Sequence, residues 1–401
     1  MLTLQGKHNT ATVFTYNIEQ EATSQIIELL SQEFIKDSKI RLMPDVHAGK
    51  GCCIGTTMTI QDKVVPNLVG VDISCGMETM VLGETKADID LKQLDEFIHK
   101  QIPAGFNIRD TLHPFTKEID LTKLKCNKHV NLDRAYKSIG TLGGGNHFIE
   151  LGENNNGNLV LVIHSGSRHL GGQIAKYYQD LAFNTMRATK SDKSEIIKRL
   201  KAEGRESEIE STLKNPMYST PKINKQLAYL EGQNLADYIH DMEIAAAYAS
   251  LNRKAMVDVI VKGLNLTEEY SFTTNHNYIE KRQDGTLMLR KGAVRAEENE
   301  LLLIPINMRD GSLLCRGKGN PDWNYSAPHG AGRLMSRSKA KDAISLEDFQ
   351  ETMKGVYSTT VGQSTLDEAP DAYKPIQEII DNINDTVEII DHIKPIYNFK
   401  G

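Results

Sequence analysis

The chain has 401 residues, of which 39% are hydrophobic and 25% are charged, a composition typical of a water-soluble globular protein. The formal net charge of -6 excludes a globally basic surface, so a nucleic acid would have to bind at a local basic patch. We expect no membrane association, because no apolar run approaches the roughly 20 residues of a membrane span and the N-terminus does not resemble a signal peptide.

The five cysteines do not form the regular pattern of a disulfide framework. They are Cys52, Cys53, Cys75, Cys126 and Cys315. An odd number at irregular spacing favours a reducing, cytoplasmic setting, where a cysteine that matters is a ligand or a nucleophile.

Glycine-rich segments carry most of the histidines and alternate with segments typical of strands and helices. They cover 43–55, 69–77, 140–147, 163–172, 273–279 and 305–332. Strands are predicted over 160–163 and 301–304. A first hairpin is predicted where 148–151 and 159–163 flank a loop rich in turn residues. With that loop centred between Asn155 and Asn156, His147 would lie directly opposite His164, with Cβ atoms roughly 5 Å apart.

Helices are predicted wherever apolar residues recur at three- and four-residue spacing. This pattern covers 174–187 and 222–263, and the charged stretch 192–214 between them predicts a solvated helical excursion. A second hairpin is expected around 283–285, with strands over 278–280 and 286–290. The segment 375–393 predicts an amphipathic helix, with one apolar face made of Ile376, Ile379, Ile380, Ile383, Val387 and Ile390.

Three of these segments offer candidate metal ligands. Asp72 and Cys75 are three residues apart in a glycine-bracketed turn, His147 and His164 flank the first hairpin, and His276 precedes the second. The alternative is structural: a capping aspartate, a core cysteine and hydrogen-bonded histidines. A mixed set of oxygen, sulfur and nitrogen donors favours a transition ion such as manganese, zinc, cobalt or iron. Two ions sharing the Cys75 thiolate would suit phosphoryl chemistry.

The stretch Pro328-His-Gly-Ala-Gly-Arg333 predicts a phosphate-binding turn, because its glycines let bare backbone approach a ligand. Arg333 and Arg337 could neutralise phosphate oxygens, and 316–320 adds positive charge. His329 is a candidate ligand, general base or nucleophile, or simply a hydrogen-bonded turn residue.

The segment 43–55 comes close to a dinucleotide fingerprint without matching it. Asp45 and His47 in this segment are candidates for orienting metal ligands, although a tight turn explains them equally well. The chain also has no phosphate-binding G-x-x-x-x-G-K-[ST] loop, no H-E-x-x-H motif and no K-x-D-G motif of the common ATP-dependent ligases.

Taken in order, six motifs resemble those of the RtcB family of RNA-splicing ligases, from about residue 40 to Lys400-Gly401. They are VGVDISCGM, GTLGGGNHFIE, VIHSGSRHLG, NHNYIE, RKGAVRA and SAPHGAGRLMSRSKAK. The resemblance implies one α+β domain over 1–401. It also implies a GTP- and Mn²⁺-dependent ligase that joins RNA 3′-phosphate or 2′,3′-cyclic phosphate ends to 5′-hydroxyl ends, with an archease-like activator as a further partner.

The resemblance also implies roles for individual residues. His329 matches the histidine that becomes guanylylated. The metal ligands of the family match Asp72, Cys75, His147, His164 and His276. The nucleotide contacts match Asn146, His147, Phe148, Ile149, Glu150, His276, Asn277, Pro305, Ile306, Asn307, Met308, Ser312, His329, Gly330, Ala331, Gly332 and Lys400.

Three departures from the family pattern predict a divergent paralogue. The loop 305–308 is Pro-Ile-Asn-Met where the family commonly has Pro-Gly-Ser-Met, and Ser74 and His169 stand where glycines are usual. An altered nucleotide loop favours RNA repair or a changed substrate. The alternatives are a metal-dependent cyclic-phosphate phosphoesterase, a divergent nucleotidyltransferase that does not ligate, or a non-catalytic RNA-binding protein.

Overall fold

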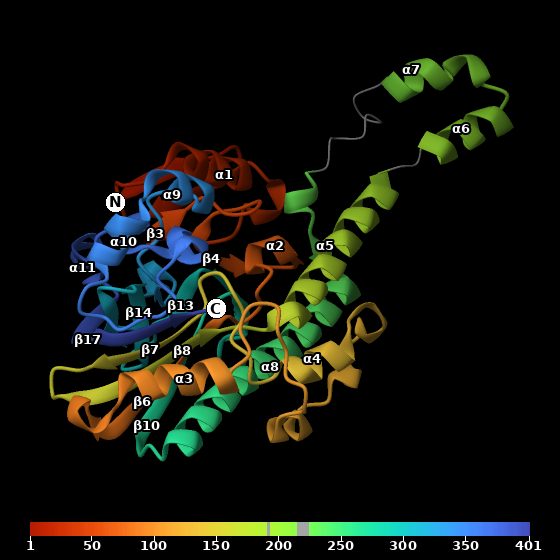
Figure 1. Cartoon of the computed structure of the whole chain (residues 1–401). Helices are drawn as coiled ribbons and strands as arrows, with labels where there is room; N and C mark the ends of the chain where they lie inside the picture. Colours follow the sequence, from red (N-terminus) through yellow and green to blue (C-terminus); the bar gives the residue numbers. More distant parts are fainter. Residues whose placement is uncertain (191–192, 215–223) are drawn as a thin grey trace.

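Two antiparallel-rich sheets and a set of covering helices make up the fold, which confirms the predicted α+β class (Figure 1). The structure is a computed structural model that describes residues 1–190, 193–214 and 224–401. The larger sheet contains, in spatial order, β10 (Glu268–Asn275), β6 (Gly76–Thr85), β8 (Asn158–Ser165), β7 (Phe148–Glu153), β17 (Val387–Lys400), β15 (Gly311–Gly317) and β14 (Leu301–Asn307). Its inner strand β8 is apolar almost throughout, because both faces of the sheet are covered there.

The second sheet holds the N-terminal strands and the second hairpin. Its order is β1 (Leu2–Gln5), β2 (Thr10–Val13), β3 (Ile40–His47), β4 (Ile54–Ile60), β12 (Leu287–Lys291) and β11 (Tyr278–Lys281). Two smaller ladders pair β13 (Ala293–Arg295) with β16 (Ser326–Pro328) and β5 (Lys63–Val64) with β9 (Leu230–Glu231). The hairpin predicted around 283–285 is confirmed, since Tyr278 pairs with Arg290.

The helices occupy the outside of the sheets and the excursion between α5 and α8. They are α1 (Gln20–Leu30), α2 (Pro66–Val69), α3 (Leu91–Gln101), α4 (Leu132–Ser138), α5 (Arg168–Lys190), α6 (Lys193–Ala202), α7 (Ile209–Lys214), α8 (Gly232–Leu264), α9 (Arg337–Ala343), α10 (Leu346–Thr352) and α11 (Ile376–Ile383). The predicted helix over 174–187 lies within α5. The predicted helix over 222–263 is correct only from Gly232 onward, because Lys225–Leu227 form a 3-10 turn and Leu230–Glu231 pair with β5, while 222 and 223 lie outside the described residues.

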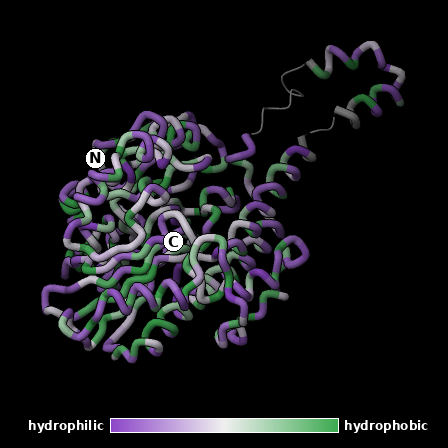
Figure 2. The backbone as a smooth tube through the Cα atoms, viewed as in Figure 1, coloured by the Kyte–Doolittle hydropathy of each residue, from purple (hydrophilic) through white to green (hydrophobic). Residues whose placement is uncertain are grey.

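The predicted excursion is also helical where the structure describes it. Figure 1 shows α6 and α7 extending away from the sheets, and Figure 2 shows hydrophilic residues recurring along both helices. Residue 192, at the start of the predicted range, lies outside the described part of the chain. Within the described ranges, we find no helix with the length and apolar character needed to cross a membrane.

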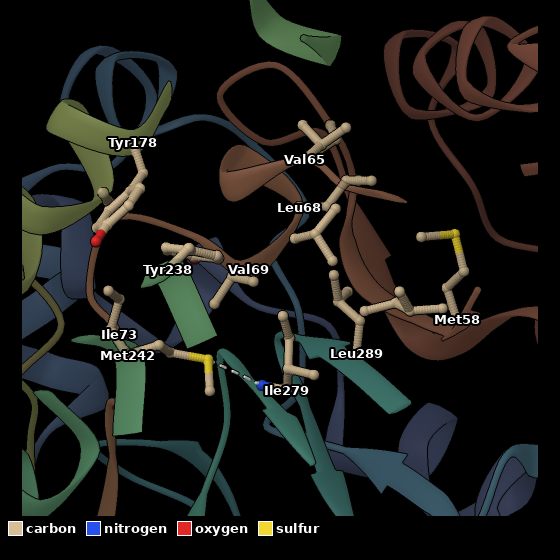
Figure 3. Close-up of a cluster of buried hydrophobic side chains, with 14 of the residues drawn as sticks. Met58, Val65, Leu68, Val69, Ile73, Tyr178, Tyr238, Met242, Ile279 and Leu289 are labelled. Atoms are coloured by element: carbon tan, nitrogen blue, oxygen red, sulfur yellow. Dashed lines mark hydrogen bonds between the residues drawn. The ribbon is translucent and has the colours of Figure 1, made fainter. Parts of the chain in front are cut away.

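Apolar side chains from both sheets and from α5 and α8 form the core. Met256 and Ile260 of α8 pack with Ile163 of the larger sheet. Figure 3 shows a second cluster where α2 and the second sheet meet α5 and α8, and there the Ile279 amide donates to the sulfur of Met242 (3.3 Å). This packing fixes α8 between the two sheets, and its buried face therefore reaches the ends of several strands.

The predicted pairing of the first hairpin is wrong by one residue. Phe148, not His147, pairs with His164. The loop has an odd number of residues, centred on Asn156, because the Asn154 amide bonds to the Asn158 carbonyl (3.0 Å) and Gly157 takes a positive φ of 85°. The loop is thus a three-residue loop with a glycine of positive φ, whereas the predicted pairing requires a loop with an even number of residues. His147 therefore lies just before β7 rather than within the ladder.

The predicted helix over 375–393 is correct only in its first half. It ends at Ile383, and the Thr386 amide closes a turn onto the Ile383 carbonyl (3.0 Å). Strand β17 then begins at Val387 and pairs with β15. Its first four residues, Val-Glu-Ile-Ile, include three β-branched side chains, and their apolar spacing fits a helix as well as a strand. Pairing with β15 determines that they form a strand.

Candidate active site

A tight turn between α2 and β6 carries Asp72 and Cys75. The Cys75 amide bonds back to the Asp72 carbonyl (3.2 Å), and Ser74 between them takes a left-handed φ of 54°. The turn is tied to the end of β10, because the His276 amide donates to the Cys75 carbonyl (2.8 Å). Residues about 200 positions apart along the chain are thus held side by side.

One guanidinium joins the strand ends around this turn. Arg253 of α8 is fully buried and donates to the carbonyls of Ser74 and Ser165, both at 3.0 Å, and to the side chain of Asn275 at 2.6 Å. Each acceptor is the sequence neighbour of one candidate ligand. Ser74 precedes Cys75, Ser165 follows His164, and Asn275 precedes His276. Arg253 therefore sets the spacing of β6, β8 and β10 where each carries a candidate ligand.

The five candidate ligands converge in two groups that share Cys75. One group is Cys75, His164 and His276, and the other is Asp72, Cys75 and His147, with the donor atoms of each group within 4.8 Å of one another. The Cys75 sulfur lies 3.2 Å from Nε2 of His164 and 3.5 Å from Nε2 of His147. Despite the corrected hairpin pairing, the rings of His147 and His164 lie 5.4 Å apart.

This donor set fits a transition metal ion. Its members are buried or nearly so, and Nδ1 of both His147 and His276 is a buried atom without a hydrogen-bond partner. Nδ1 of His164 bonds to the Asn146 carbonyl (3.1 Å), which leaves its Nε2 facing Cys75. Carboxylate, thiol and imidazole donors together suit a transition ion better than calcium or magnesium.

The charges within this cluster are shaped by burial. Burial raises the pKa of the Cys75 thiol well above its usual value and lowers the pKa of His164 and of His276 well below theirs. For Asp72, burial would raise the pKa, but the hydrogen bond from His147 (3.0 Å) and its charge outweigh that effect and hold the pKa at about 2. Asp72 therefore supplies a negative charge inside a largely neutral cluster.

His329 lies directly after β16 and is held by Asp45 of β3. Oδ2 of Asp45 is 2.6 Å from Nδ1 of the imidazole and also accepts the His329 amide (3.1 Å). The glycines of the turn permit this contact, because a Cβ on Gly332 would lie 2.4 Å from the Asp45 carbonyl oxygen. With Nδ1 occupied, Nε2 is the nitrogen left for chemistry, and the ring packs 4.8 Å from that of His276.

The sequence predicts that Asp45 orients a metal ligand, whereas in the structure Asp45 orients His329. His47, the other residue named for that role, bonds through Nδ1 to the Asp45 carbonyl (2.8 Å) and lines the cavity described next.

A cavity of about 690 Å³ opens beside His329. Twelve of the residues that the family resemblance assigns to nucleotide contacts line it. They are Asn146, Phe148, Glu150, Pro305, Ile306, Asn307, Met308, His329, Gly330, Ala331, Gly332 and Lys400. His164 also reaches its wall, so the cavity connects His329 to the ligand cluster.

The other five predicted contacts lie elsewhere. His147 and His276 belong to the ligand cluster, while Ile149 and Ser312 are fully buried away from the cavity wall. The side chain of Asn277 donates to the Asp72 carbonyl (3.2 Å) and accepts the Gly292 amide (2.8 Å). Its role in the structure is therefore to support the turn that carries the ligands.

The cavity wall also holds two carboxyl groups of opposite character, Glu150 and Glu368. Burial raises the pKa of Glu150 to about 8, although Asn398 and Lys400 oppose it, and its Oε1 has no hydrogen-bond partner. Glu368 accepts from Lys400 (3.0 Å), and this cation and Arg337 outweigh burial and hold its pKa at about 2. The cavity thus presents a protonatable group beside a fixed ion pair.

Sequence reasoning missed Glu368 and Tyr373, which also line the cavity. They lie in an irregular segment without periodicity, so only the folded chain brings them to Lys400. The cations expected to meet phosphate are largely paired in this structure. Arg333 bonds to the Tyr373 hydroxyl (3.2 Å), and Arg337 contacts both Asp367 and Glu368 at 2.8 Å.

The positive segment 316–320 does not reach the cavity. Arg316 pairs with Glu388 at 3.8 Å, and Lys318 donates to the Asn384 carbonyl. Neither residue is part of the cavity wall.

The altered loop 305–308 forms without backbone strain. None of its residues takes a positive φ, and Ile306 is buried in the core. Asn307 caps the following turn, because its Oδ1 accepts the amides of Arg309 (3.0 Å) and Asp310 (2.8 Å). This chain therefore needs no glycine at position 306.

Comparison with known proteins gives a consistent result. The family model described as tRNA-splicing ligase RtcB matches residues 25–401. The RNA-splicing ligase RtcB of Escherichia coli strain K12 is 31% identical over 419 residues, covering 96% of this chain and 95% of that protein. The tRNA-splicing ligase RtcB of Methanococcus maripaludis is 26% identical (92% and 89% covered), and that of Aeropyrum pernix is 25% identical (84% and 82% covered).

Proposed function

We propose, because the chain belongs to the tRNA-splicing ligase RtcB family, that it joins RNA 3′-phosphate or 2′,3′-cyclic phosphate ends to 5′-hydroxyl ends using GTP and Mn²⁺. The whole chain 1–401 would act as a single cytoplasmic ligase domain. An archease-like protein is proposed as its activator.

The observation that carries this proposal is the state of His329. Asp45 holds Nδ1 at 2.6 Å and His329 lines the cavity, so a neutral His329 that donates its Nδ1 proton to Asp45 would have its electron pair on Nε2. Nε2 would attack the α-phosphorus of GTP, forming a P–N bond while the bond to the bridging oxygen breaks and pyrophosphate leaves. The Asp45 carboxylate stabilises the positive imidazole that results.

A 2′,3′-cyclic end is first opened when water attacks its phosphorus, the bond to the 2′-oxygen breaks and that oxygen takes up a proton. Two further displacements then complete the reaction. An oxygen of the RNA 3′-phosphate attacks the phosphorus on His329, breaks the P–N bond and becomes capped by GMP. The RNA 5′-hydroxyl oxygen then attacks the 3′-phosphorus, GMP leaves with the electron pair, and the hydroxyl proton passes to solvent. Each displacement depends on in-line geometry and on neutralised phosphate charge.

Asp72, Cys75, His147, His164 and His276 would hold Mn²⁺, and their two donor groups would suit two ions. The metal would supply neutralisation of phosphate charge. Glu150 and Lys400 of the cavity wall would contact the nucleotide through the Glu150 carboxyl and the Lys400 ammonium.

A labelling experiment tests the proposal. The protein is incubated with Mn²⁺ and GTP labelled at the α-phosphate, then denatured, and protein-bound label is counted. We expect an acid-labile, alkali-stable label in the parent chain and none in His329→Ala. No label from GTP, and none from ATP in a parallel reaction, would contradict the proposed function.

A further inference from the structure

Phe106 is the most exposed large hydrophobic side chain among the described residues. Its side chain is 94% exposed, yet the backbone of its loop is held firmly. The Gly105 amide donates to the Gly143 carbonyl (2.8 Å), Arg168 donates to the Gly105 carbonyl (2.9 Å), and Arg134 donates to the Phe106 carbonyl (2.8 Å). The loop therefore presents the ring to solvent from a fixed base.

This loop abuts the ligand cluster, and its residues Gly105 and Phe106 lie outside the cavity wall. A Cβ on Gly143 would lie 2.5 Å from Nδ1 of His147, so the backbone that binds Gly105 touches the cluster directly. His164, on the other side of Cys75, lines the cavity, whereas His147 and Gly143 do not. Gly143 and the ligand cluster thus connect the loop of Phe106 to the cavity that holds His329.

Two arginines lie beside the loop: Arg134, which bonds to the Phe106 carbonyl, and Arg109, which follows the loop in the sequence. Among the described residues, neither forms an ion pair with a carboxylate, whereas Arg168 is partly buried and interacts with the charge of Asp72. A single exposed hydrophobic residue is ordinary on a protein surface. An exposed aromatic ring beside arginines without a carboxylate partner is less ordinary. Single-stranded RNA fits such a surface, because its bases stack on aromatic rings and its phosphates bind arginines.

We infer that Phe106 is a stacking platform for a base of the RNA strand that carries the 5′-hydroxyl, with Arg109 and Arg134 contacting its phosphates. This inference rests on the proposed function. In the last displacement the 5′-hydroxyl must approach opposite the departing GMP. GMP departs into the cavity, where His329 lies, so the 5′-hydroxyl strand needs an approach outside the cavity wall, and the loop of Phe106 offers one.

Fluorescence of a Phe106→Trp variant tests the contact without GTP. The native Trp323 is the one tryptophan of the chain and is buried against Phe14, so it gives a constant background. A single-stranded RNA with a 5′-hydroxyl should quench the new tryptophan, and the same RNA with abasic sites in its first nucleotides should quench it far less. Equal quenching by both, or quenching only by an RNA that offers a 3′-phosphate and a blocked 5′ end, would overturn the inference.

Ligation kinetics of Phe106→Ala give an independent test. We expect the KM for the 5′-hydroxyl strand to rise about tenfold or more, as for the loss of one stacked base, with kcat little changed. Guanylylation of His329 should keep the parent rate, which distinguishes this result from failure of the proposed function. Tyr270→Ala, which removes an exposed aromatic ring on the edge strand β10, is the control and should leave the KM unchanged. An unchanged KM in Phe106→Ala would overturn the inference.

Discussion

Oδ2 of Asp45 lies 2.6 Å from Nδ1 of His329 and accepts the backbone amide of the same residue. One carboxylate oxygen therefore fixes the position of the histidine and the tautomer of its ring. Asp45 is fully buried, so solvent does not compete for this contact.

Asp45→Asn should lower the rate of His329 guanylylation by about 10²- to 10⁴-fold. An asparagine can turn its amide group toward Nδ1 and donate to it, which places the ring proton on Nε2 and removes the attacking electron pair. The measurement is the initial rate of label transfer from α-labelled GTP. Glu21→Gln, which changes another carboxylate at the cavity, is the control and should keep the parent rate. A parent rate in Asp45→Asn would contradict this role.

Cys75→Ala and His329→Ala should separate metal binding from nucleotide transfer. Because Cys75 belongs to both donor groups, its loss should remove bound transition metal from the dialysed protein, measured by elemental analysis. His329→Ala should keep the metal and lose the label. Both variants should fail to ligate. If His329→Ala still converts cyclic-phosphate ends at the parent rate and the parent never ligates, the phosphoesterase alternative is favoured.

Ser74→Gly should raise the free energy of unfolding by about 0.5–1 kcal/mol. Ser74 takes a φ of 54°, which costs a residue with a Cβ roughly 1–2 kcal/mol, and glycine avoids that cost while losing some entropy. Urea unfolding of the two proteins measures the difference. Ser24→Gly, in the middle of helix α1, should instead lower the free energy of unfolding by about 0.5–1 kcal/mol. A loss of stability in both variants would show that the Ser74 side chain is needed.

The buried carboxyl of Glu150 should make the protein less stable as the pH rises. The pKa of Glu150 is about 8 in the folded state and about 4.5 in the unfolded chain. Between these two pH values the native state therefore binds more protons than the unfolded state. The contribution of Glu150 to stability should therefore be full below about pH 4.5 and fall by up to about 1.4 kcal/mol per pH unit as the pH rises toward 8.

Glu150→Gln removes this titration and should flatten the slope, measured by urea unfolding at several pH values. Glu153→Gln changes a half-buried glutamate of the same strand and should leave the slope as it is. An equal slope in the parent chain and in Glu150→Gln would contradict the assignment.

The sequence alone identified the candidate ligands and His329, because each stands in a glycine-rich segment where regular packing does not explain it. It did not give the pairing of the first hairpin, since one residue more or less in the loop around Asn156 shifts the ladder by one position. The helix predicted from the sequence also runs beyond the end of α11 at Ile383. The β-branched residues from Val387 onward suit both a helix and a strand, and only their pairing with β15 distinguishes the two.

Other features of the site have no local signal. Arg253 is one of several cations along α8, and nothing nearby in the sequence marks it as the buried one. Glu368 likewise gains its importance from distant partners, Lys400 lying 32 positions later and Arg337 earlier in the chain. Long-range contacts of this kind are decided by tertiary packing and leave no periodic pattern in the chain.

The hydrogen bonds of Arg253 also affect how the protein folds. Their acceptors are Ser74, Ser165 and Asn275, which lie at the ends of three strands far apart in the sequence. The three acceptors meet only after α8 has docked against the larger sheet. Partly folded chains would therefore lack the ligand cluster, and an ion that binds it would bind the native state alone. Metal binding would then stabilise the native state by mass action, so metal depletion during synthesis would leave a larger fraction of the chains unfolded.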